Sequence, residues 1–381
     1  MRWVPAPGEA DGMRTLFAVP ALVLAVTAAA PVLPAGAAQA RAAEVGVRLE
    51  LPRPTGALPV GTTSFALRDD ARADPWVPAE RRHLMVTMWY PAHVRTGMPT
   101  PYLSQAESAA LTAEFGVAPS DALTRVRTNS LADARPLGRR APLVVLSPGF
   151  RMPRATLSSL AEELASRGYA VAGIGHDHEA VATTFPDGRT TGCAACAHPD
   201  PDRIAAGRAA DVSFVLDRLT GPRPVWGGGR LIDAGRIALA GHSAGGNTVV
   251  PAMHADPRIG AGVTMDGISG VSAVGADRPY LMLGAPENAP GSPFWDRAWA
   301  ASTDWKRWLT FDAGQHYSFS DVVLLADQFD HDPGEPLTGA RGVEITRAYV
   351  AAFVDHHLRG CTEPLFDGPS ARYPEARYWR P

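Results

Sequence analysis

Lysine is almost absent from this sequence of 381 residues: Lys306 is its only lysine, so arginine supplies nearly all of the 36 basic residues, against 39 acidic ones. The formal net charge is −3, and the basic residues form no cluster. Nucleic-acid-binding proteins concentrate positive charge on one surface, so no nucleic acid partner is expected. No internal repeat divides the chain, whose 46% hydrophobic and 20% charged residues are ordinary for a globular protein.

Cysteine is also scarce, with Cys193, Cys196 and Cys361 as the whole set. The GCAAC segment has the spacing of a redox motif, but it follows no strand and opens no helix, as such a site requires. A metal site would need a second cysteine or histidine pair, and only His198 lies nearby, so neither a metal nor a cofactor is predicted. In an oxidising compartment the sequence predicts one disulfide, either Cys193 with Cys196 or one of them with Cys361.

Long hydrophobic runs are missing except near the N-terminus. Arg14 precedes an apolar stretch from residue 16 to residue 30, and A-x-A cleavage patterns end at Ala40 and Ala42. The stretch is short for a membrane span and contains proline, and no cysteine follows it that could carry a lipid. We therefore predict that residues 1–42 are a cleaved signal peptide and that the protein is secreted, extracellular or periplasmic.

The remainder, residues 43–381, reads as a single α/β domain. Segments 46–52, 62–69 and 84–90 are predicted strands separated by proline and glycine turns. Later strands are short and wholly apolar, as in parallel sheets buried on both faces. They are 143–147, 169–174, 236–240, 260–265, 279–284 and 308–312, with helical patterns at 156–168, 202–219 and 342–360 between or after them. This order predicts antiparallel N-terminal strands followed by a mostly parallel central sheet flanked by helices.

Two insertions interrupt this pattern, at about 91–141 and 176–202, and long loops of this kind often form lids or binding walls. The His-Asp-His sequence at 176–178 lacks a third ligand at a fixed spacing, so we do not interpret it as a metal site. A tryptophan-rich segment at 295–308 has two interpretations. It is either a helix that packs its aromatic rings on the core or a lipid-facing rim beside the pocket.

A Gly-His-Ser-Ala-Gly-Gly sequence follows the predicted strand 236–240 and precedes a predicted helix at 244–255. Gly241, Ser243 and Gly245 fit the G-x-S-x-G pattern of a nucleophile elbow, in which a tight strand-to-helix turn exposes the serine hydroxyl. Neighbouring side chains must be nearly absent in such a turn, which explains the glycines. The sequence therefore predicts Ser243 as a nucleophile rather than as a residue of an ordinary turn.

A serine nucleophile needs a base, and in this architecture the chain order is serine, acid, histidine. His316 lies in a loop just after the predicted strand 308–312, where it can reach back to Ser243. His254 is expected on the outer side of the elbow helix, and His356 and His357 are expected to be solvated on the last helix. We therefore predict His316 as the base.

Two carboxylates compete for the third position. Asp266 ends the apolar strand 260–265, where an ionised side chain without a partner would be costly. A histidine N–H would be such a partner, and on the residues alone Asp266 is preferred. Glu287 follows the next strand, where many serine hydrolases of this architecture carry their acid, and it stays open as the alternative.

An acyl-transfer site also needs N–H donors for the oxyanion. The Ser-Pro-Gly-Phe turn after strand 143–147 can aim the N–H of Phe150 at the site. Ala244, which follows the nucleophile at the helix N-terminus, supplies the second N–H.

These stretches together resemble the platelet-activating factor acetylhydrolase family of α/β-hydrolases, including bacterial secreted esterases. The similar segments are LMVTMWYPA, PLVVLSPGFR, LASRGYAVAGIGHDHEA, RIALAGHSAGGNTVV, IGAGVTMDG and AGQHYSFSD. The resemblance implies Ser243 as nucleophile, Asp266 as acid, His316 as base in an H-x-x-F-S-D loop, and Phe150 as oxyanion donor, with no metal. One departure is Ser-Pro-Gly-Phe where the mammalian enzymes carry His-Gly, a form also found in cutinase-like and polyester-cleaving hydrolases.

The resulting expectation is a secreted serine ester hydrolase that acts through an acyl-enzyme on short-acyl or phospholipid-type esters. Its partner would be a small-molecule or lipid ester, with transient contact to a lipid surface. A cutinase-like lipase or polyesterase is the nearest alternative, and a peptidase would use the same three residues. A non-catalytic binding protein of the same fold is the alternative of another class, against which the complete serine, aspartate and histidine set argues.

Overall fold

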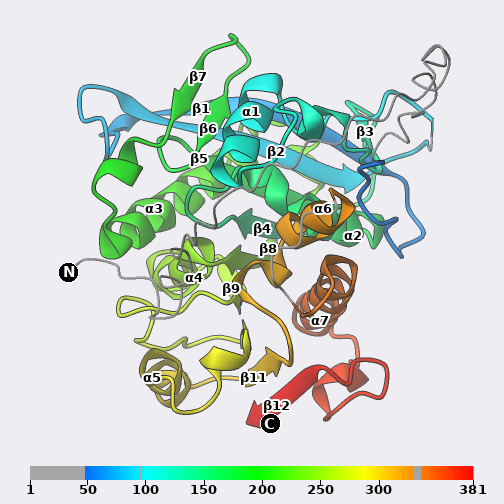
Figure 1. Cartoon of the computed structure of the whole chain (residues 1–381), viewed down its shortest axis with the longest axis vertical. Helices are drawn as coiled ribbons and strands as arrows, with labels where there is room; N and C mark the ends of the chain where they lie inside the picture. Colours follow the sequence, from blue (N-terminus) through cyan, green and yellow to red (C-terminus); the bar gives the residue numbers. More distant parts are fainter. Residues whose placement is uncertain (1–47, 95, 330–335, 381) are drawn as a thin grey trace, which may run out of the picture. The chain divides into compact units, whose positions relative to one another are not determined.

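The computed structural model describes residues 48–94, 96–329 and 336–380. Its central feature is a ten-stranded sheet with the order β12-β11-β10-β9-β8-β4-β5-β2-β1-β3. In Figure 1 the sheet extends from β1 and β2 near the top to β12 at the bottom. The predicted signal peptide, residues 1–42, lies outside the described residues. The strands are β1 (Val60–Ala73), β2 (Arg81–Pro91), β3 (Ser130–Ala132), β4 (Ala141–Ser147), β5 (Ala170–His176), β8 (Ile232–His242), β9 (Ile259–Met265), β10 (Tyr280–Gly284), β11 (Lys306–Phe311) and β12 (Ala376–Arg380).

The directions of the strands agree with the predicted arrangement of antiparallel strands followed by a parallel sheet. The middle strands, from β5 through β4, β8, β9 and β10 to β11, run parallel. The N-terminal strand β2 is antiparallel to both β1 and β5. The prediction of antiparallel strands before a parallel sheet is thus confirmed. The two edge strands β3 and β12 were not predicted, because they have only three and five residues.

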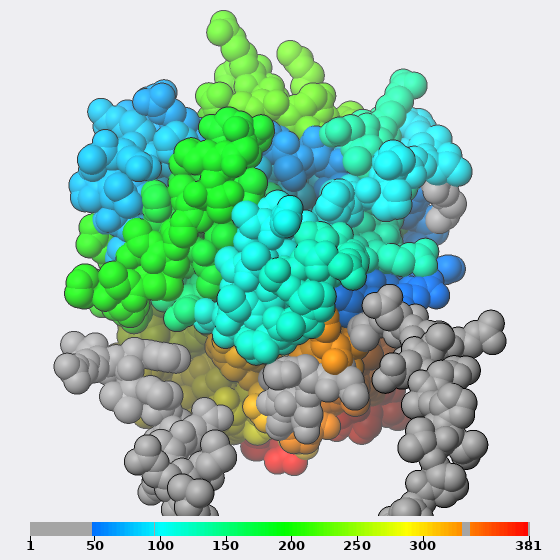
Figure 2. Space-filling model, turned by 45° about the horizontal axis from the view of Figure 1, so that its top comes forward, coloured from blue at the N-terminus to red at the C-terminus, as the bar shows by residue number. Residues whose placement is uncertain are grey.

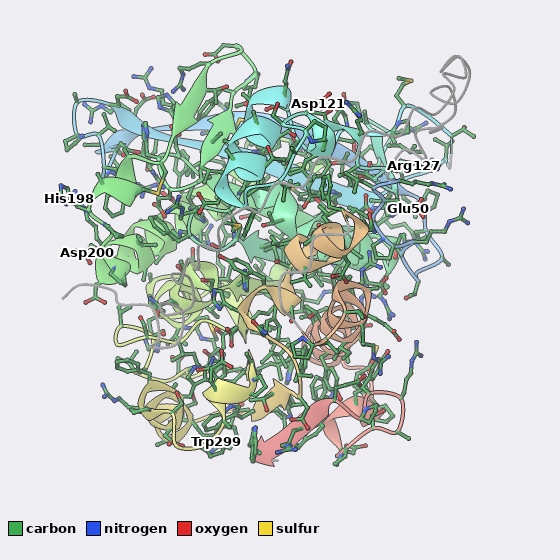
Figure 3. All side chains as sticks on the ribbon, viewed as in Figure 1. Glu50, Asp121, Arg127, His198, Asp200 and Trp299 are labelled. Atoms are coloured by element: carbon green, nitrogen blue, oxygen red, sulfur yellow. A yellow bond between two sulfur atoms is a disulfide. The ribbon has the colours of Figure 1, made fainter. Side chains whose placement is uncertain are left out.

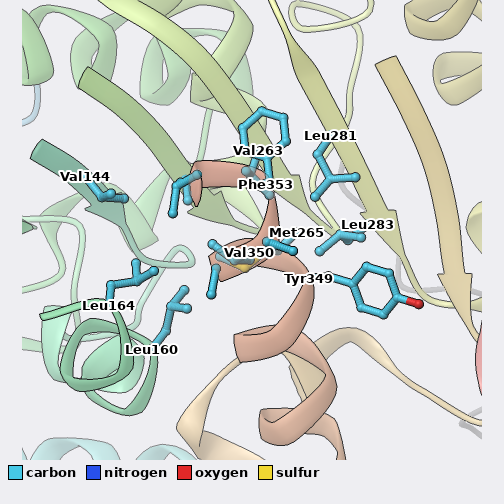
Figure 4. Packing of buried hydrophobic residues seen from close by; sticks show 14 of the residues in the cluster. Val144, Leu160, Leu164, Val263, Met265, Leu281, Leu283, Tyr349, Val350 and Phe353 are labelled. Carbon is cyan, nitrogen blue, oxygen red and sulfur yellow. The ribbon is translucent and has the colours of Figure 1, made fainter. Parts of the chain in front are cut away.

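Helices cover both faces of the parallel part. On one face pack α2 (Ser158–Ser166) and α7 (Gly339–Arg359), and on the other α3 (Pro201–Thr220), α4 (Ala244–Ala255) and α5 (Pro293–Ala301). Along β4, Val144 and Leu146 join the first core, shown in Figure 4, while Leu143 and Val145 join the second. Burial on both faces explains why these strands are continuously apolar rather than alternating.

The first predicted strand, 46–52, is wrong. In its described part, the backbone makes only an isolated bridge between Glu50 and Arg127, both labelled in Figure 3. Two N–H groups of the bridge donate across it, Leu51 to Arg127 and Arg127 to Leu49. Pro52 and Pro54 follow directly, and because proline has no N–H the pairing does not extend into a ladder.

The two predicted insertions fold into small elements that contact each other. The first contains α1 (Gln105–Glu114) and β3, and the second a hairpin of β6 (Ala182–Thr184) and β7 (Thr190–Gly192). The hydroxyls of Ser104 and Thr184 lie 2.7 Å apart, and the Thr184 N–H donates to Glu107 at 3.3 Å. Figure 2 shows the cyan α1 region beside the green second insertion on one face of the molecule.

The second insertion also holds a disulfide between Cys193 and Cys196, while Cys361 is an exposed free thiol. The structure thereby selects the first of the two pairings that the sequence left open. Asp200, labelled in Figure 3, then caps α3 by accepting from the N–H groups of Asp202 and Arg203.

The tryptophan-rich segment divides between α5 and β11 rather than forming one helix. Trp295 and Trp308 are buried and stack with ring centroids 5.9 Å apart. Trp299, labelled in Figure 3, lies against the Trp308 ring and under the ammonium group of Lys306. These contacts favour the core interpretation over a lipid-facing rim. Across the described ranges, no helix is long and apolar enough to cross a membrane.

Candidate active site

Ser243 occupies the sharp turn between β8 and α4, with φ of 55° and ψ of −120°. A non-glycine residue adopts such angles only at an energetic cost, which the surrounding packing must offset. The flanking glycines allow this packing. A Cβ on Gly241 would lie 2.2 Å from the carbonyl carbon of Gly245, and one on Gly245 would lie 2.0 Å from the Ser147 oxygen. The glycines of the elbow are therefore sterically required.

His316 begins a short 3₁₀ turn, His316–Phe319, that follows β11. Its Nε2 lies 2.8 Å from Ser243 Oγ, and its Nδ1 lies 2.6 Å from Asp266 Oδ2. The side chain of His316 is 41% exposed, whereas that of Asp266 is 2% exposed. The structure thus brings the three residues together in the order acid, histidine, serine, with the serine end open to a substrate.

Asp266 sits directly after β9 with φ of 51°. Its second carboxylate oxygen, Oδ1, accepts from the Ala285 N–H at 2.7 Å and from Asn288 Nδ2 at 2.6 Å. Burial alone would raise the pKa of this carboxyl, but the hydrogen bond and charge of His316, together with those two donors, outweigh it and lower the pKa. Asp266 is therefore held as an ionised acceptor facing His316.

Gly267 explains why the Asp-Gly pair is needed at this position. A Cβ at Gly267 would lie 1.9 Å from the carbonyl oxygen of Ser243. The Ser243 N–H donates to the Met265 carbonyl at 2.9 Å. The acid loop and the nucleophile elbow are therefore in direct backbone contact.

Glu287, the alternative acid, is exposed in the 3₁₀ turn Pro286–Asn288. The structure does not bring it to His316. Its neighbour Asn288 turns inward instead and donates to Asp266. Sequence reasoning missed Asn288, because nothing in the spacing of a loop asparagine distinguishes it from a residue that makes a local turn.

His242, the residue before the nucleophile, was also missed. It is buried, its ring lies 4.9 Å from that of His316, and its Nε2 lies 2.7 Å from the His316 carbonyl oxygen. Burial, followed by the charge of His316, lowers the pKa of His242 to about 3. The ring is therefore neutral, and its Nε2–H donates to the carbonyl, which fixes the backbone that carries the base. The sequence feature that could have identified His242 is its position inside the elbow motif, directly before Ser243.

The turn predicted to bind an oxyanion lies against the elbow. A Cβ on Gly149 would be 3.4 Å from the Ser243 Cβ. Phe150 follows Gly149, and its N–H makes no hydrogen bond within the described residues. Ala244 is the first residue of α4, where an N–H has no intrahelical acceptor. Both N–H groups are therefore available beside Ser243.

Asp321 ends the H-x-x-F-S-D segment, yet it does not contact His316. Its carboxylate accepts from the N–H and hydroxyl of Ser159 on α2 and from the Tyr102 hydroxyl. Burial raises the pKa of Asp321 to about 7 despite those donors. The residue therefore anchors the histidine loop to α2 and to the first insertion.

This anchor predicts a pH-dependent stability. Because the pKa of Asp321 is raised to about 7 in the folded protein, the folded state keeps a proton that the unfolded chain releases near pH 4. Stability from this group is complete below about pH 4 and falls as pH rises to about 7, by roughly 1 kcal/mol per pH unit. Asp321→Asn removes this slope. Urea denaturation of both proteins from pH 4 to pH 8 checks it, and parallel profiles would refute the assignment.

The His-Asp-His sequence is structural. His176 lies between the Ser147 hydroxyl and the Asp211 carboxylate, and His178 contacts Glu80. In the part of the chain that the structure describes, no group of three histidine, cysteine, aspartate or glutamate side chains is arranged to hold a metal ion. His254 is exposed on α4, as expected. His356 and His357 are not solvated as predicted but half-buried against Trp305.

Comparisons with known proteins place this geometry among esterases. Residues 45–194, which include the Ser-Pro-Gly-Phe turn but not the elbow, match the family model described as platelet-activating factor acetylhydrolase, isoform II. A probable 1-alkyl-2-acetylglycerophosphocholine esterase of Arthroderma benhamiae is 29% identical, over 89% of this chain and 96% of that protein. A solved ferulic acid esterase from Streptomyces cinnamoneus is 42% identical with a TM-score of 0.80, over 87% of this chain and 99% of that one.

Proposed function

Since the chain belongs to the platelet-activating factor acetylhydrolase-like family of α/β-hydrolases and is a carboxylic ester hydrolase, we propose that Ser243, His316 and Asp266 are its catalytic triad. The observation that carries this proposal is the hydrogen-bonded chain from Asp266 Oδ2 through the His316 ring to Ser243 Oγ, with distances of 2.6 and 2.8 Å. A structural role for these three polar groups would not require a strained serine beside an open histidine edge.

The mechanism follows from the donors and acceptors. An ionised Asp266 can only accept, so His316 Nδ1 carries a hydrogen and Nε2 is left as the base. Nε2 takes the Ser243 hydroxyl proton as Oγ attacks the ester carbonyl. The imidazolium then donates that proton to the departing alcohol, and the acyl group remains on Ser243. Water, deprotonated by the same Nε2, attacks the acyl carbon. The imidazolium returns that proton to Ser243 Oγ as the bond between the acyl carbon and Oγ breaks, which releases the acid and restores the site.

Charge develops on the carbonyl oxygen during both attacks. The N–H groups of Phe150 and Ala244 are the donors proposed to bind it. They follow the ends of two neighbouring parallel strands, β4 and β8. Each such donor is worth roughly 10²- to 10³-fold in kcat in related chemistry.

For the substrate we propose a short-acyl ester, with an acetylated or oxidised phospholipid as the first candidate. The similarity to the Arthroderma benhamiae esterase over most of both chains supports this choice. An ester of ferulic acid is a second candidate, favoured by the higher identity of 42% to the Streptomyces cinnamoneus esterase. The two candidates differ in the acyl group, which is acetyl in one and an aromatic propenoyl in the other.

A substrate panel tests the proposal. Purified protein would be assayed with p-nitrophenyl esters of increasing chain length, a 2-acetyl phospholipid, methyl ferulate, a polyester film and a peptide amide. We expect ester turnover with a maximum at short acyl chains and no turnover of the amide. A maximum at long chains or on the film would favour the lipase or polyesterase alternative, and no turnover of any ester would contradict the proposed function.

We also propose that the protein is exported after removal of its N-terminal segment. The mature chain should begin between residues 41 and 44, because the A-x-A patterns end there. It should contain one disulfide, Cys193–Cys196, and one thiol, Cys361. Intact mass of the exported protein, before and after alkylation with and without reductant, checks both points. An intact N-terminus or three alkylated thiols without reductant would contradict export to an oxidising compartment.

A further inference from the structure

Beneath the Ser-Pro-Gly-Phe turn lies a buried cluster of charged side chains that the proposed chemistry does not use. Arg82 and Arg208 are 0% and 1% exposed, and they pair with buried carboxylates of Asp74, Glu179 and Asp211. Removing so many charges from water is costly and rarely adds net stability. Because stability does not explain a cluster of this kind, we looked for a role in the candidate active site beside it.

Arg208, on α3, is the member that reaches the turn. Its Nη1 donates to the Pro148 carbonyl oxygen at 2.5 Å and lies 3.4 Å from the Ser147 hydroxyl. Its Nε donates to Glu179 Oε2 at 2.7 Å, and the other oxygen of Glu179 accepts from Arg82 at 3.2 Å. The guanidinium fork of Arg208 is thus held by Glu179 and aimed at the backbone of the turn.

The turn is fixed on its other sides as well. Glu179 and Val181 pair with the backbone of Arg151, with N–H to oxygen distances of 2.8 Å each way. The Gly149 carbonyl accepts from the Met152 N–H at 3.2 Å. That carbonyl shares a planar peptide with the Phe150 N–H, and the two point in opposite directions. The Met152 N–H is therefore one restraint on the direction of the Phe150 N–H.

The contacts described so far do not fix the orientation of the peptide plane between Pro148 and Gly149. The two peptide planes that meet at a glycine rotate more freely than those at any other residue, because glycine has no Cβ. If the Pro148 carbonyl were unrestrained, rotation at Gly149 could turn the Phe150 N–H away from Ser243. The hydrogen bond from Arg208 restrains this carbonyl, and Glu179, which holds the Arg208 guanidinium, supplies the rigidity that an oxyanion donor requires.

We propose that Arg208 is a positioning residue for ester hydrolysis: it holds the Pro148 carbonyl so that the Phe150 N–H faces the oxyanion. This inference rests on the proposed function, because it assigns a role only if Ser243 attacks a carbonyl. It predicts that loss of the Arg208 contact weakens transition-state binding and leaves substrate binding nearly unchanged.

The test compares Arg208→Lys with Arg82→Lys, two charge-conserving changes in one buried cluster. Lysine keeps the charge but lacks the fork that spans Glu179 and the turn. Arg208→Lys should lower kcat by roughly 10- to 100-fold with KM within about twofold. A trifluoromethyl ketone, which forms a tetrahedral adduct on serine, should lose affinity in parallel. Arg82 does not contact the turn, so Arg82→Lys should lower thermal stability while kcat stays within about threefold.

A second variant guards against misfolding. Arg208→Gln combined with Glu179→Gln removes both charges of the pair, so that no unpaired buried charge is left. This double variant should fold and show the same loss of kcat and of ketone affinity. Wild-type kcat in either folded Arg208 variant, or an equal loss in Arg82→Lys, would overturn the inference. Absence of ester turnover by the wild-type protein would instead overturn the proposed function.

Discussion

Ser243→Ala should lower kcat for ester hydrolysis by roughly four to six orders of magnitude while the protein stays folded. The hydroxyl of Ser243 bonds to His316 Nε2 at the open side of the site, so its loss removes the nucleophile and little packing. Alanine has the same backbone restriction as serine at a φ of 55°. The elbow itself should therefore be preserved.

A nearby serine supplies the control for this result. Ser269 Oγ donates to Asn247 Oδ1 at 2.7 Å, in the loop after the acid, and it does not contact His316. Ser269→Ala should keep kcat within a few-fold of wild type. Stopped assays with a p-nitrophenyl ester, together with thermal denaturation of both variants, provide the measurement. Comparable activity in Ser243→Ala and Ser269→Ala would remove Ser243 from the mechanism.

Asp266→Asn should lower kcat by about four orders of magnitude through a change of tautomer. Oδ1 of Asp266 accepts from Ala285 and Asn288. In the variant the amide oxygen would keep these two donors, so the amide nitrogen would face His316. Nδ1 would then have to accept, and the hydrogen would move to Nε2, which could no longer take the serine proton.

Glu287→Gln is the matched control, because it is the competing acid and lies one residue before Asn288. The Glu287 side chain is exposed, so the Glu287→Gln variant should have the activity of the wild type. Circular dichroism would show that both variants keep the fold, and the pH–rate profile of Asp266→Asn should rise at high pH as hydroxide replaces the lost base. A nearly silent Asp266→Asn with a damaged Glu287→Gln would reverse the assignment of the acid.

Much of this site was predictable because Ser243, Asp266 and His316 each follow the end of a strand. Strand 236–240 and helix 244–255 were readable from periodicity, and the glycines around Ser243 made the elbow specific. The preference for Asp266 followed from the cost of an unpaired carboxylate after a buried strand. The structure adds the distance of each side chain from His316, which a sequence pattern does not give.

Other features were not predictable, for reasons that differ. Asn288 acts on Asp266, a residue distant in sequence, so no local pattern identifies it. The elbow motif contains His242 but does not show that its ring contacts the His316 carbonyl. The buried pair of Arg208 and Glu179 joins a helix to an insertion, and either residue alone would be read as a surface charge. The strand expected at 46–52 failed because an alternating pattern predicts a strand without knowing whether a partner strand is available.

Mapping the adduct of a fluorophosphonate shows whether Ser243 is the residue acylated during turnover. The wild-type protein would be labelled, digested and analysed by tandem mass spectrometry. We expect a single adduct on Ser243, its loss in Ser243→Ala, and much slower labelling in Asp266→Asn. An adduct on a different residue, or equal labelling of Ser243→Ala, would contradict this assignment.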